Sequence, residues 1–157
     1  MKCTFISMSL EKDLKQERFT NEYEKMVVNI LFTGSWLASL NSSRLKPFGV
    51  TPEQYNVLRI LRGSHPKPMM LADITCRMID RNSNATRLVE KLRQKGLVKR
   101  EICETNRRQV DISITDGGLE VLKKIDENRD AWLENLKTVS MGEAQDLNMK
   151  LDKLRGQ

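Results

Sequence analysis

The side chains best suited to chemistry lie in one short stretch of the chain, and the chemistry they suit is recognition of nucleic acid. Arginine can donate two hydrogen bonds to a guanine, asparagine can bracket an adenine, and serine, threonine and lysine can bind bases or phosphates. On an isolated helix, the cations among them would more simply be solvated surface residues. The candidate DNA contacts are Ser83, Asn84, Thr86, Arg87 and Lys91.

Two adjacent arginines, Arg107 and Arg108, form a second candidate site, with Asn106 directly before them. Guanidinium groups at the tip of a two-stranded ribbon can enter the minor groove of DNA, where narrow A·T tracts attract them. An isolated Arg-Arg pair is a weak signal. It gains weight here because the pair follows closely after a candidate recognition helix.

The excess positive charge falls in the same part of the chain. Lysine and arginine number 27 and aspartate and glutamate 21, which gives a formal net charge of +6. Between Arg77 and Arg108 there are ten basic and four acidic residues, so the remaining residues of the two signs cancel. Such a patch favours an anionic partner such as DNA, although a solvated charged face without a partner gives the same count.

The residues around these side chains predict two helices joined by a turn and followed by a hairpin. The second helix has an apolar face that leaves Arg87 on the opposite side, with Asn84 and Lys91 on one shoulder and Thr86 on the other. Gly96 is suited to cap its C-terminal end. Residues 97–103 and 110–115 then predict two antiparallel strands, with residues 104–108 as the tip of the hairpin. The inward residues of the two helices are Leu71, Ile74 and Met78, then Ala85, Leu88, Val89 and Leu92.

Further helices are predicted on both sides of this lobe. Residues 19–40 show the apolar stripe of a long helix, and Thr51–Gln54 is a capping box that begins another. After the hairpin, one continuous helix is predicted from Thr115 to near Val139, and the capping box Ser140–Glu143 opens a final helix.

Composition and motifs exclude other classes of protein. The 157 residues fit one domain, and no apolar run is long enough to span a bilayer, so we expect a cytoplasmic protein without membrane contact. Cys3, Cys76 and Cys103 have no CxxC spacing and are accompanied by a single histidine, so we expect neither a metal site nor a cofactor. The sequence has no Gly-rich phosphate loop, nucleophile elbow or HExxH motif, so we do not expect an enzyme.

In four segments the sequence resembles the MarR family of bacterial transcriptional regulators: Ala72–Met78, Asn84–Arg100, Asn106–Arg108 and Ile112–Gly118. The resemblance implies a mainly α fold with a small β-hairpin wing, which is a winged helix-turn-helix with N- and C-terminal dimerisation helices. It also implies a homodimer that binds a pseudo-palindromic operator on double-stranded DNA, usually as a repressor, and that a small aromatic effector releases in some members.

The resemblance assigns roles to both candidate sites. The residues of the 83–91 stretch would contact bases and the backbone, and Arg108 would enter the minor groove with Arg107 beside it. Asn106 stands where the family usually has an aspartate that orients the inserted arginine. An amide can hold the guanidinium by one hydrogen bond but adds no charge, so the wing is expected to be looser.

The outer helices support dimerisation independently of the resemblance. They carry apolar stripes but have little to pack on in a single chain, so a partner chain would cover them. The alternative is that they fold back on their own lobe. The candidate interface residues are Tyr23, Ile30, Trp132, Leu136, Leu147 and Leu151.

We therefore predict one MarR-like domain over residues 1–157, with dimerisation helices at about 19–48 and 116–155 and a DNA-binding lobe at about 51–115. Two other functions stay open: a winged-helix module that binds protein, and a regulator that senses redox state through a cysteine. Cys76 lies on a helix near its apolar face and Cys103 lies on a strand, so both are expected to be ordinary buried or half-buried cysteines.

Overall fold

The computed structural model describes residues 10–15, 18–103, 106–134 and 136–156, and at 103 and 106–109 it describes the backbone alone. By contacts within the chain, the residues divide into two units, 1–43 and 44–157. The organisation as one domain with the boundaries given above stays a prediction.

The first unit contains a short helix, α1 (Leu10–Leu14), and most of a long helix, α2 (Glu22–Leu45). The Asn21 Oδ1 atom accepts hydrogen bonds from the backbone N–H groups of Tyr23 at 2.9 Å and Glu24 at 3.0 Å, so Asn21 caps α2. The long helix predicted over residues 19–40 is therefore present, but it begins later and continues to Leu45.

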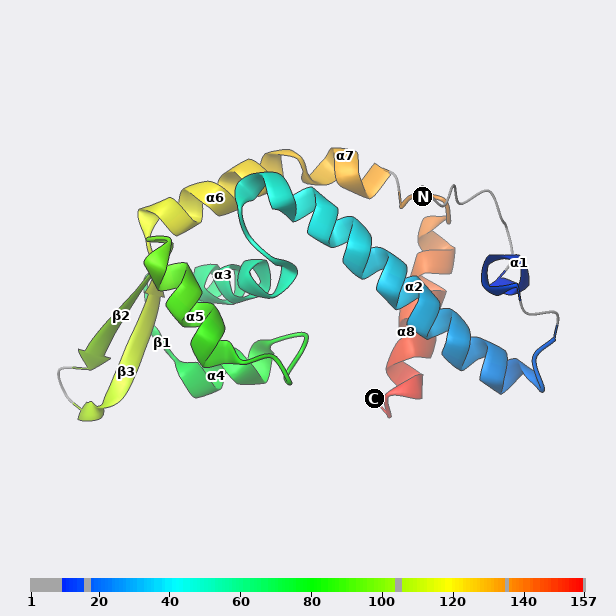
Figure 1. Cartoon of the computed structure of the whole chain (residues 1–157), viewed down its shortest axis with the longest axis horizontal. Coiled ribbons are helices and arrows are strands. Elements are labelled where there is room, and N and C mark those ends of the chain that lie inside the picture. The colour runs from blue at the N-terminus through cyan, green and yellow to red at the C-terminus, as the bar shows by residue number, and fades with distance from the viewer. Residues whose placement is uncertain (1–9, 16–17, 104–105, 135, 157) are drawn as a thin grey trace. The chain divides into compact units, whose positions relative to one another are not determined.

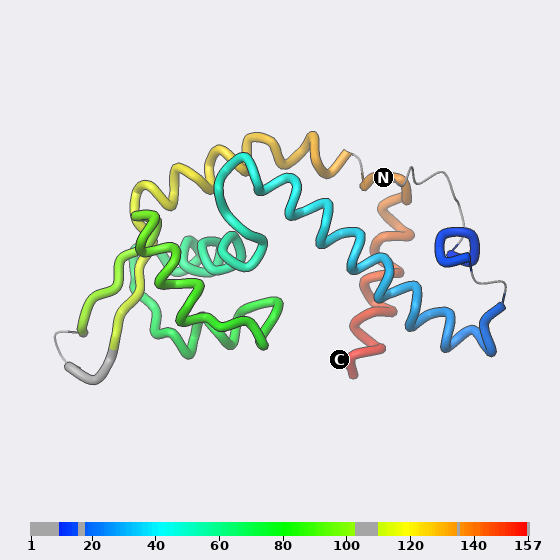
Figure 2. The backbone as a smooth tube through the Cα atoms, in the orientation of Figure 1, coloured from blue at the N-terminus to red at the C-terminus, as the bar shows by residue number. Residues whose placement is uncertain are grey.

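The second unit begins with the last two residues of α2, Arg44 and Leu45, followed by a short 3-10 helix, η1 (Lys46–Phe48). It then folds into a lobe of short helices and strands, which Figures 1 and 2 show. This order confirms the predicted fold class, a mainly α winged helix-turn-helix with a small hairpin wing. The elements of the lobe are α3 (Pro52–Ser64), β1 (Met69–Met70), α4 (Leu71–Arg77), α5 (Ala85–Gln94), β2 (Val98–Cys103) and β3 (Asn106–Ile114). The elements that follow are α6 (Asp116–Glu127), α7 (Arg129–Glu134) and α8 (Met141–Leu154).

The helix starts predicted from capping boxes are confirmed. At the start of α3, the Thr51 Oγ1 atom accepts from the Gln54 N–H at 3.3 Å, and the Gln54 Oε1 atom accepts from the Thr51 N–H at 3.2 Å. Ser140 and Glu143 make the same reciprocal pair at the start of α8. Each box satisfies backbone N–H groups that the first turn of a helix leaves without a partner.

The sheet has one strand more than predicted, in the order β1-β3-β2, with all pairs antiparallel. β1 consists of two residues, Met69 opposite Ile112 and Met70 opposite Asp111. β3 also begins earlier than expected: Asn106 already pairs with Cys103, so the prediction that residues 104–108 form the hairpin tip is wrong for 106–108, and residues 104–105 lie outside the described part.

One core holds the lobe together. It takes side chains from every helix of the lobe, from the sheet and from α6, which Figure 1 shows beside α3. The apolar faces predicted for the two helices of the helix-turn-helix are confirmed, except that Leu71 and Leu88 are half-buried at its margin. The most deeply buried apolar side chains are Leu45, Val57, Leu58, Leu61, Ile74, Leu92, Ile112, Leu122 and Ile125.

The helix predicted to run without a break from Thr115 to near Val139 is interrupted at Asn128, which separates α6 from α7. In a continuous α-helix the N–H of residue 128 would donate to the carbonyl of Lys124. Instead, the Asn128 side-chain Nδ2 donates to that carbonyl at 3.0 Å, and its backbone N–H donates to Ile125 O at 3.3 Å. A side chain that competes for a backbone acceptor in this way ends the helix.

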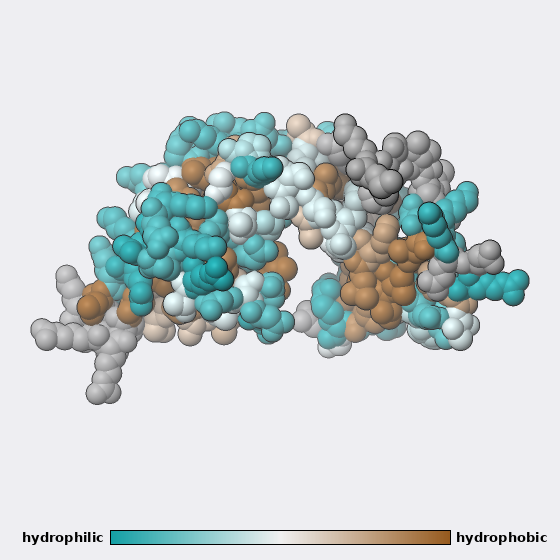
Figure 3. All heavy atoms as spheres, in the orientation of Figure 1, coloured by the Kyte–Doolittle hydropathy of each residue, from teal (hydrophilic) through white to brown (hydrophobic). Residues whose placement is uncertain are grey.

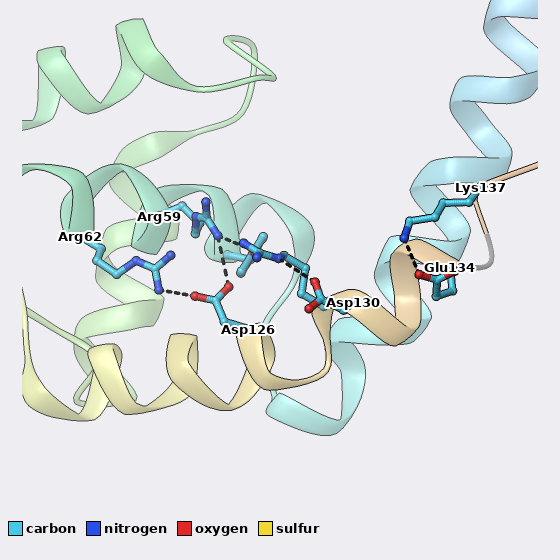
Figure 4. Close-up of polar contacts among 8 residues, drawn as sticks. Arg59, Arg62, Asp126, Asp130, Glu134 and Lys137 are labelled. Carbon is cyan, nitrogen blue, oxygen red and sulfur yellow. Dashed lines mark hydrogen bonds and ion pairs between the residues drawn. The ribbon is translucent and has the colours of Figure 1, made fainter. Parts of the chain in front are cut away.

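An ionic link joins α6 to α3. Asp126 of α6 lies between two arginines on successive turns of α3, as Figure 4 shows. Its Oδ1 atom is 3.3 Å from Arg59 Nη1 and its Oδ2 atom is 2.6 Å from Arg62 Nη1. The three side chains are partly buried, so solvent screens the link less than it screens an ion pair at the surface.

Candidate nucleic-acid interface

The helix α5 separates its apolar and polar residues onto opposite faces. Ala85, Val89 and Leu92 are buried against the lobe, whereas Arg87 and Lys91 are exposed one turn apart on the outer side. Neither cationic group has a hydrogen bond or ion pair to another described residue. In Figure 3 the outer surface of α5 is hydrophilic. These two cations are therefore available to an external anion.

Asn84 is the N-cap of α5, and Thr86, one of the predicted contacts, is exposed in its first turn. The Asn84 Oδ1 atom accepts from the Arg87 backbone N–H at 2.9 Å. To bracket an adenine, the amide would need both its oxygen and its nitrogen. With the oxygen engaged as a cap, Nδ2 is left to donate to a base or a phosphate.

Ser83 is engaged within the loop that precedes α5. Its hydroxyl donates to Asp80 Oδ2 at 2.7 Å, and the backbone N–H of Asn82 donates to Asp80 Oδ1 at 2.9 Å. These hydrogen bonds, that from the Ser83 hydroxyl first, lower the pKa of Asp80. The Ser83 oxygen can still accept a hydrogen bond, but the hydroxyl must leave Asp80 before it can donate to a phosphate.

Two cations of the basic stretch are already engaged within the protein. The Arg93 Nε and Nη2 atoms donate to both carboxylate oxygens of Glu90, at 3.0 and 2.8 Å, and this pairing is the main reason that the pKa of Glu90 is lowered. The Lys95 ammonium donates to Gly49 O and to Gln54 Oε1. Counting charges in the sequence could not separate Lys95 from Arg87 and Lys91, because the partners of Lys95 lie more than 40 residues away along the chain.

The predicted wing contacts fall on β3, but their side chains lie outside the described part of the structure. Ile102 pairs with Val110 and the next residue, Cys103, pairs with Asn106, so residues 107–109 have no opposite residue on β2. Such an insertion bends the strand that carries it and changes the direction of its side chains. Both arginines of the wing lie in this irregular segment.

The expectation for Cys76 is wrong, because this cysteine is exposed on α4. The buried side of α4 is formed by Ile74, and a residue two positions farther along a helix points to the opposite side. Cys3 and the Cys103 side chain lie outside the described residues. Within the described ranges, no group of three His, Cys, Asp or Glu side chains could hold a metal ion, and no helix has the length and apolar character to cross a bilayer.

The predicted dimerisation residues differ in exposure. Tyr23 and Ile30 on α2 are 79% and 38% exposed, and Leu147 on α8 is 54% exposed. Leu136 and Leu151 are half-buried. Trp132 is half-buried against its own chain, with the Arg44 guanidinium carbon 4.3 Å from the centre of a ring. Their role between two chains stays a prediction.

Most of the lobe matches the model of a known protein family. The model of the MarR family matches residues 50–110, which contain the helix-turn-helix and most of the wing. No curated protein sequence matches the chain at a significant level.

Solved structures match over most of their own length. A MarR transcription factor from Planctomyces limnophilus is 29% identical with a TM-score of 0.65, over 88% of this chain and 98% of that chain. AbsC, a MarR family transcriptional regulator from Streptomyces coelicolor, is 25% identical with a TM-score of 0.73, over 89% and 99%. MepR from S. aureus, solved as a DNA complex, is 19% identical with a TM-score of 0.74, over 88% and 98%, and at that identity the likeness is one of fold.

Proposed function

Over residues 50–110 this chain belongs to the MarR family of winged helix-turn-helix transcriptional regulators, and we propose that it binds a specific sequence of double-stranded DNA, as a repressor. The observation that carries this proposal is the outer face of α5, where Arg87 and Lys91 are exposed and free of partners among the described residues. A helix of this length fits the major groove when its outer side carries such groups.

The proposed roles follow from the geometry of each side chain. Arg87 reads a guanine, because its planar fork can donate to O6 and N7 together, and Lys91 binds the phosphate backbone as a point charge. Thr86 and the free Asn84 Nδ2 contact a base or a nearby phosphate. Ser83 contributes mainly by accepting a hydrogen bond, because its proton is held by Asp80.

The wing is proposed to contact the adjacent minor groove through Arg108, with Arg107 beside it. Support comes from their position in the irregular segment of β3, where the backbone has no opposite residue on β2. Asn106 begins β3 next to them and could hold one guanidinium by a single hydrogen bond.

A homodimer is proposed on the basis of two helices with uncovered apolar side chains. α8 has no buried residue among the described ones, and α2 carries exposed apolar side chains that include Val27, Ile30 and Leu31. A two-fold dimer would present its two α5 helices to half-sites about 34 Å apart, one turn of DNA, which suits a pseudo-palindromic operator. The interface residues proposed are Tyr23, Ile30, Trp132, Leu136, Leu147 and Leu151.

Release by a small aromatic effector is proposed with support from Arg44. Its guanidinium lies over Trp132 and 5.3 Å from the ring centre of Tyr55. The Arg44 Nε and Trp132 Nε1 atoms are buried, and neither has a hydrogen-bond partner among the described residues. Two unpaired donors beside two aromatic rings suit a ligand that carries both a ring and an acceptor oxygen.

The test is a salt titration of binding to duplex DNA. We expect a steep loss of affinity with salt, at a slope of about 0.9 per phosphate neutralised. Arg87→Ala should cost about 1–3 kcal/mol on the preferred sequence and relax the base preference, whereas Lys91→Ala should weaken binding to all sequences alike. Equal losses on preferred and unrelated duplexes for Arg87→Ala would refute base reading. An absence of duplex binding at low salt would favour the winged-helix module that binds protein.

A further inference from the structure

Lys95 differs from the other cations near α5 in what its ammonium group contacts. Its Nζ atom is 2.6 Å from the carbonyl oxygen of Gly49 and 3.0 Å from Gln54 Oε1. Lys91, one turn earlier, has no such partner among the described residues. Lys95 is thus held by the protein, although it belongs to the same basic stretch.

The two acceptors are themselves held firmly. Gln54 is only 2% exposed, and its Oε1 atom also accepts from the Thr51 N–H as part of the capping box of α3. Gly49 ends η1 with φ at +68°, a conformation that favours glycine, and its N–H donates to Lys46 O at 3.0 Å. The ammonium therefore meets a fixed corner of the lobe.

Lys95 also sits at the end of the helix that would read DNA. It is the C-cap of α5, where its own N–H donates to Lys91 O, and Gly96 with φ at +70° then turns the chain toward β2. The side chain therefore ties the C-terminal end of α5 to the N-terminal end of α3.

Because the Lys95 contacts hold the C-terminal end of α5, a small change in them displaces the opposite, N-terminal end of the helix. α5 has ten residues and is about 15 Å long, so a rotation of about 5° about its C-terminal end moves its N-terminal end by roughly 1.3 Å. Hydrogen bonds from Arg87 to a guanine tolerate only a few tenths of an ångström. A small change of tilt would leave phosphate contacts in place, because a mobile lysine side chain can follow the backbone.

From these contacts we infer that Lys95 is a positioning residue for sequence recognition and does not contact phosphate. The inference rests on the proposed DNA-binding function. Lys95 sets the tilt of α5 in the major groove through Gly49 and Gln54, and Arg87 reads the base that this tilt presents.

Lys95→Met tests the inference, because methionine keeps most of the apolar stem and removes the ammonium. The matched control is Lys91→Met, the same change one turn away on the same helix. The probes are a duplex selected by the wild-type protein from a random-sequence pool and an unrelated duplex of equal length, each titrated at several salt concentrations.

For Lys95→Met we expect about a tenfold fall in the ratio of affinities for the selected and unrelated duplexes, with the salt slope and the affinity for the unrelated duplex unchanged. For Lys91→Met we expect both affinities to fall together and the slope to drop by about 0.9, one phosphate contact. A slope reduced by Lys95→Met in the same way would overturn the inference, and so would an unchanged affinity ratio.

Amide hydrogen exchange in the absence of DNA separates failure of the tie from failure of the proposed function. Lys95→Met should speed exchange of the backbone amides of Thr51 and of residue 95, with the melting temperature nearly unchanged. Exchange identical to wild type would show that the tie does not hold α5, which overturns the inference. If exchange changes but the wild-type protein binds no duplex, the proposed function fails and the positioning role fails with it.

Discussion

Asn84 has two roles that compete for one side chain. Its oxygen caps α5, and its nitrogen is the group left for the DNA contact proposed above, so the residue would matter both for stability and for recognition. Ser83 is similar, because its hydroxyl proton serves Asp80. A residue predicted to contact DNA from its type alone can thus have part of its hydrogen-bonding capacity committed to the fold.

Substitution of Asn84 separates the two roles. Asn84→Asp keeps a good N-cap and adds a negative charge that the helix N-terminus favours, so the melting temperature should be unchanged or slightly raised. The same charge faces the phosphates, so affinity for any duplex should fall by about tenfold. Circular dichroism and a binding titration measure the two effects.

The control is Asn84→Ser, which keeps the cap without adding charge. It should leave stability close to wild type, and because it removes only the Nδ2 contact and adds no charge, its affinity for unrelated duplexes should fall much less than that of Asn84→Asp. Wild-type DNA affinity in Asn84→Asp would mean that the N-terminal end of α5 does not approach the phosphates.

At the residue scale, the sequence indicated the right helix face but not the state of each side chain. Helical spacing correctly placed Arg87 opposite the buried residues of α5, and Lys91, predicted on a shoulder of the helix, is exposed as well. The same spacing gave Lys95 no distinct role, because its acceptors, Gly49 and Gln54, are brought to it by the fold of the lobe. Hydrogen bonds between distant segments leave no local periodic signal.

At the element scale, the start of α6 lies very close to the turn between α5 and β2. A Cβ atom on Gly118 would lie 2.3 Å from Leu97 O and 2.7 Å from Ile114 Cγ1, so the backbone would have to move. Gly118→Ala should therefore cost about 2 kcal/mol or more and lower the melting temperature by roughly 4–8 °C.

The neighbouring glycine provides the control for this contact. A Cβ on Gly117 would meet its nearest atom, Gly96 O, at 3.5 Å, which is an ordinary contact. Gly117→Ala should therefore leave the melting temperature unchanged or raise it, since alanine is the better helix former. Equal melting temperatures for the two variants would show that α6 does not approach this turn.

The link from α6 to α3 can be tested in the same way. Asp126→Asn removes the charge that meets Arg59 and Arg62, and because the three groups are partly buried the expected cost is about 1 kcal/mol, or roughly 2–4 °C in melting temperature. Thermal unfolding at low and at high salt measures it.

Asp130→Asn is the matched control, shown in the same close-up in Figure 4. The Asp130 side chain is 87% exposed and 3.6 Å from Arg129 Nε, so its loss should change the melting temperature by less than about 1 °C. If both variants behaved alike, Asp126 would not hold α6 to α3.

Elements set by local chemistry were predictable, and those set by distant pairing were not. The capping boxes at Thr51 and Ser140 act within four residues, so their helices begin where predicted. β1 has two residues and pairs with a strand about 40 residues away, so it is too short to show the alternation of apolar and polar residues that predicts a strand. The break at Asn128 is an exception, because it is set by a local contact with Lys124 and yet apolar spacing continues from Ile125 to Trp132 across it.

At the scale of the whole molecule, the apolar stripes on the outer helices were visible in the sequence, but the surface that covers them was not. α8 has a capping box and an apolar stripe, yet none of its described residues is buried. A 14-residue helix of this kind is marginal alone in water, so packing must stabilise it. A second copy of the chain is the partner proposed above.

Leu147→Glu tests that partner. Leu147 lies on the apolar stripe of α8 and is 54% exposed in the single chain, so a carboxylate there costs little in a monomer. In a dimer the same carboxylate would be buried without a counter-ion, which costs several kcal/mol at each of two symmetric sites. Sedimentation velocity at micromolar concentration should show a dimer for the wild type and a monomer for Leu147→Glu.

Gln145→Glu is the control, because residue 145 is about 160° around the same helix from residue 147 and receives the same side chain. It should remain dimeric with unchanged DNA binding. Loss of the dimer should also weaken binding to a palindromic duplex far more than to a single half-site, since only the dimer engages both halves at once. A wild-type protein that sediments as a monomer, or a Leu147→Glu variant that stays dimeric, would exclude this face of α8 from the interface.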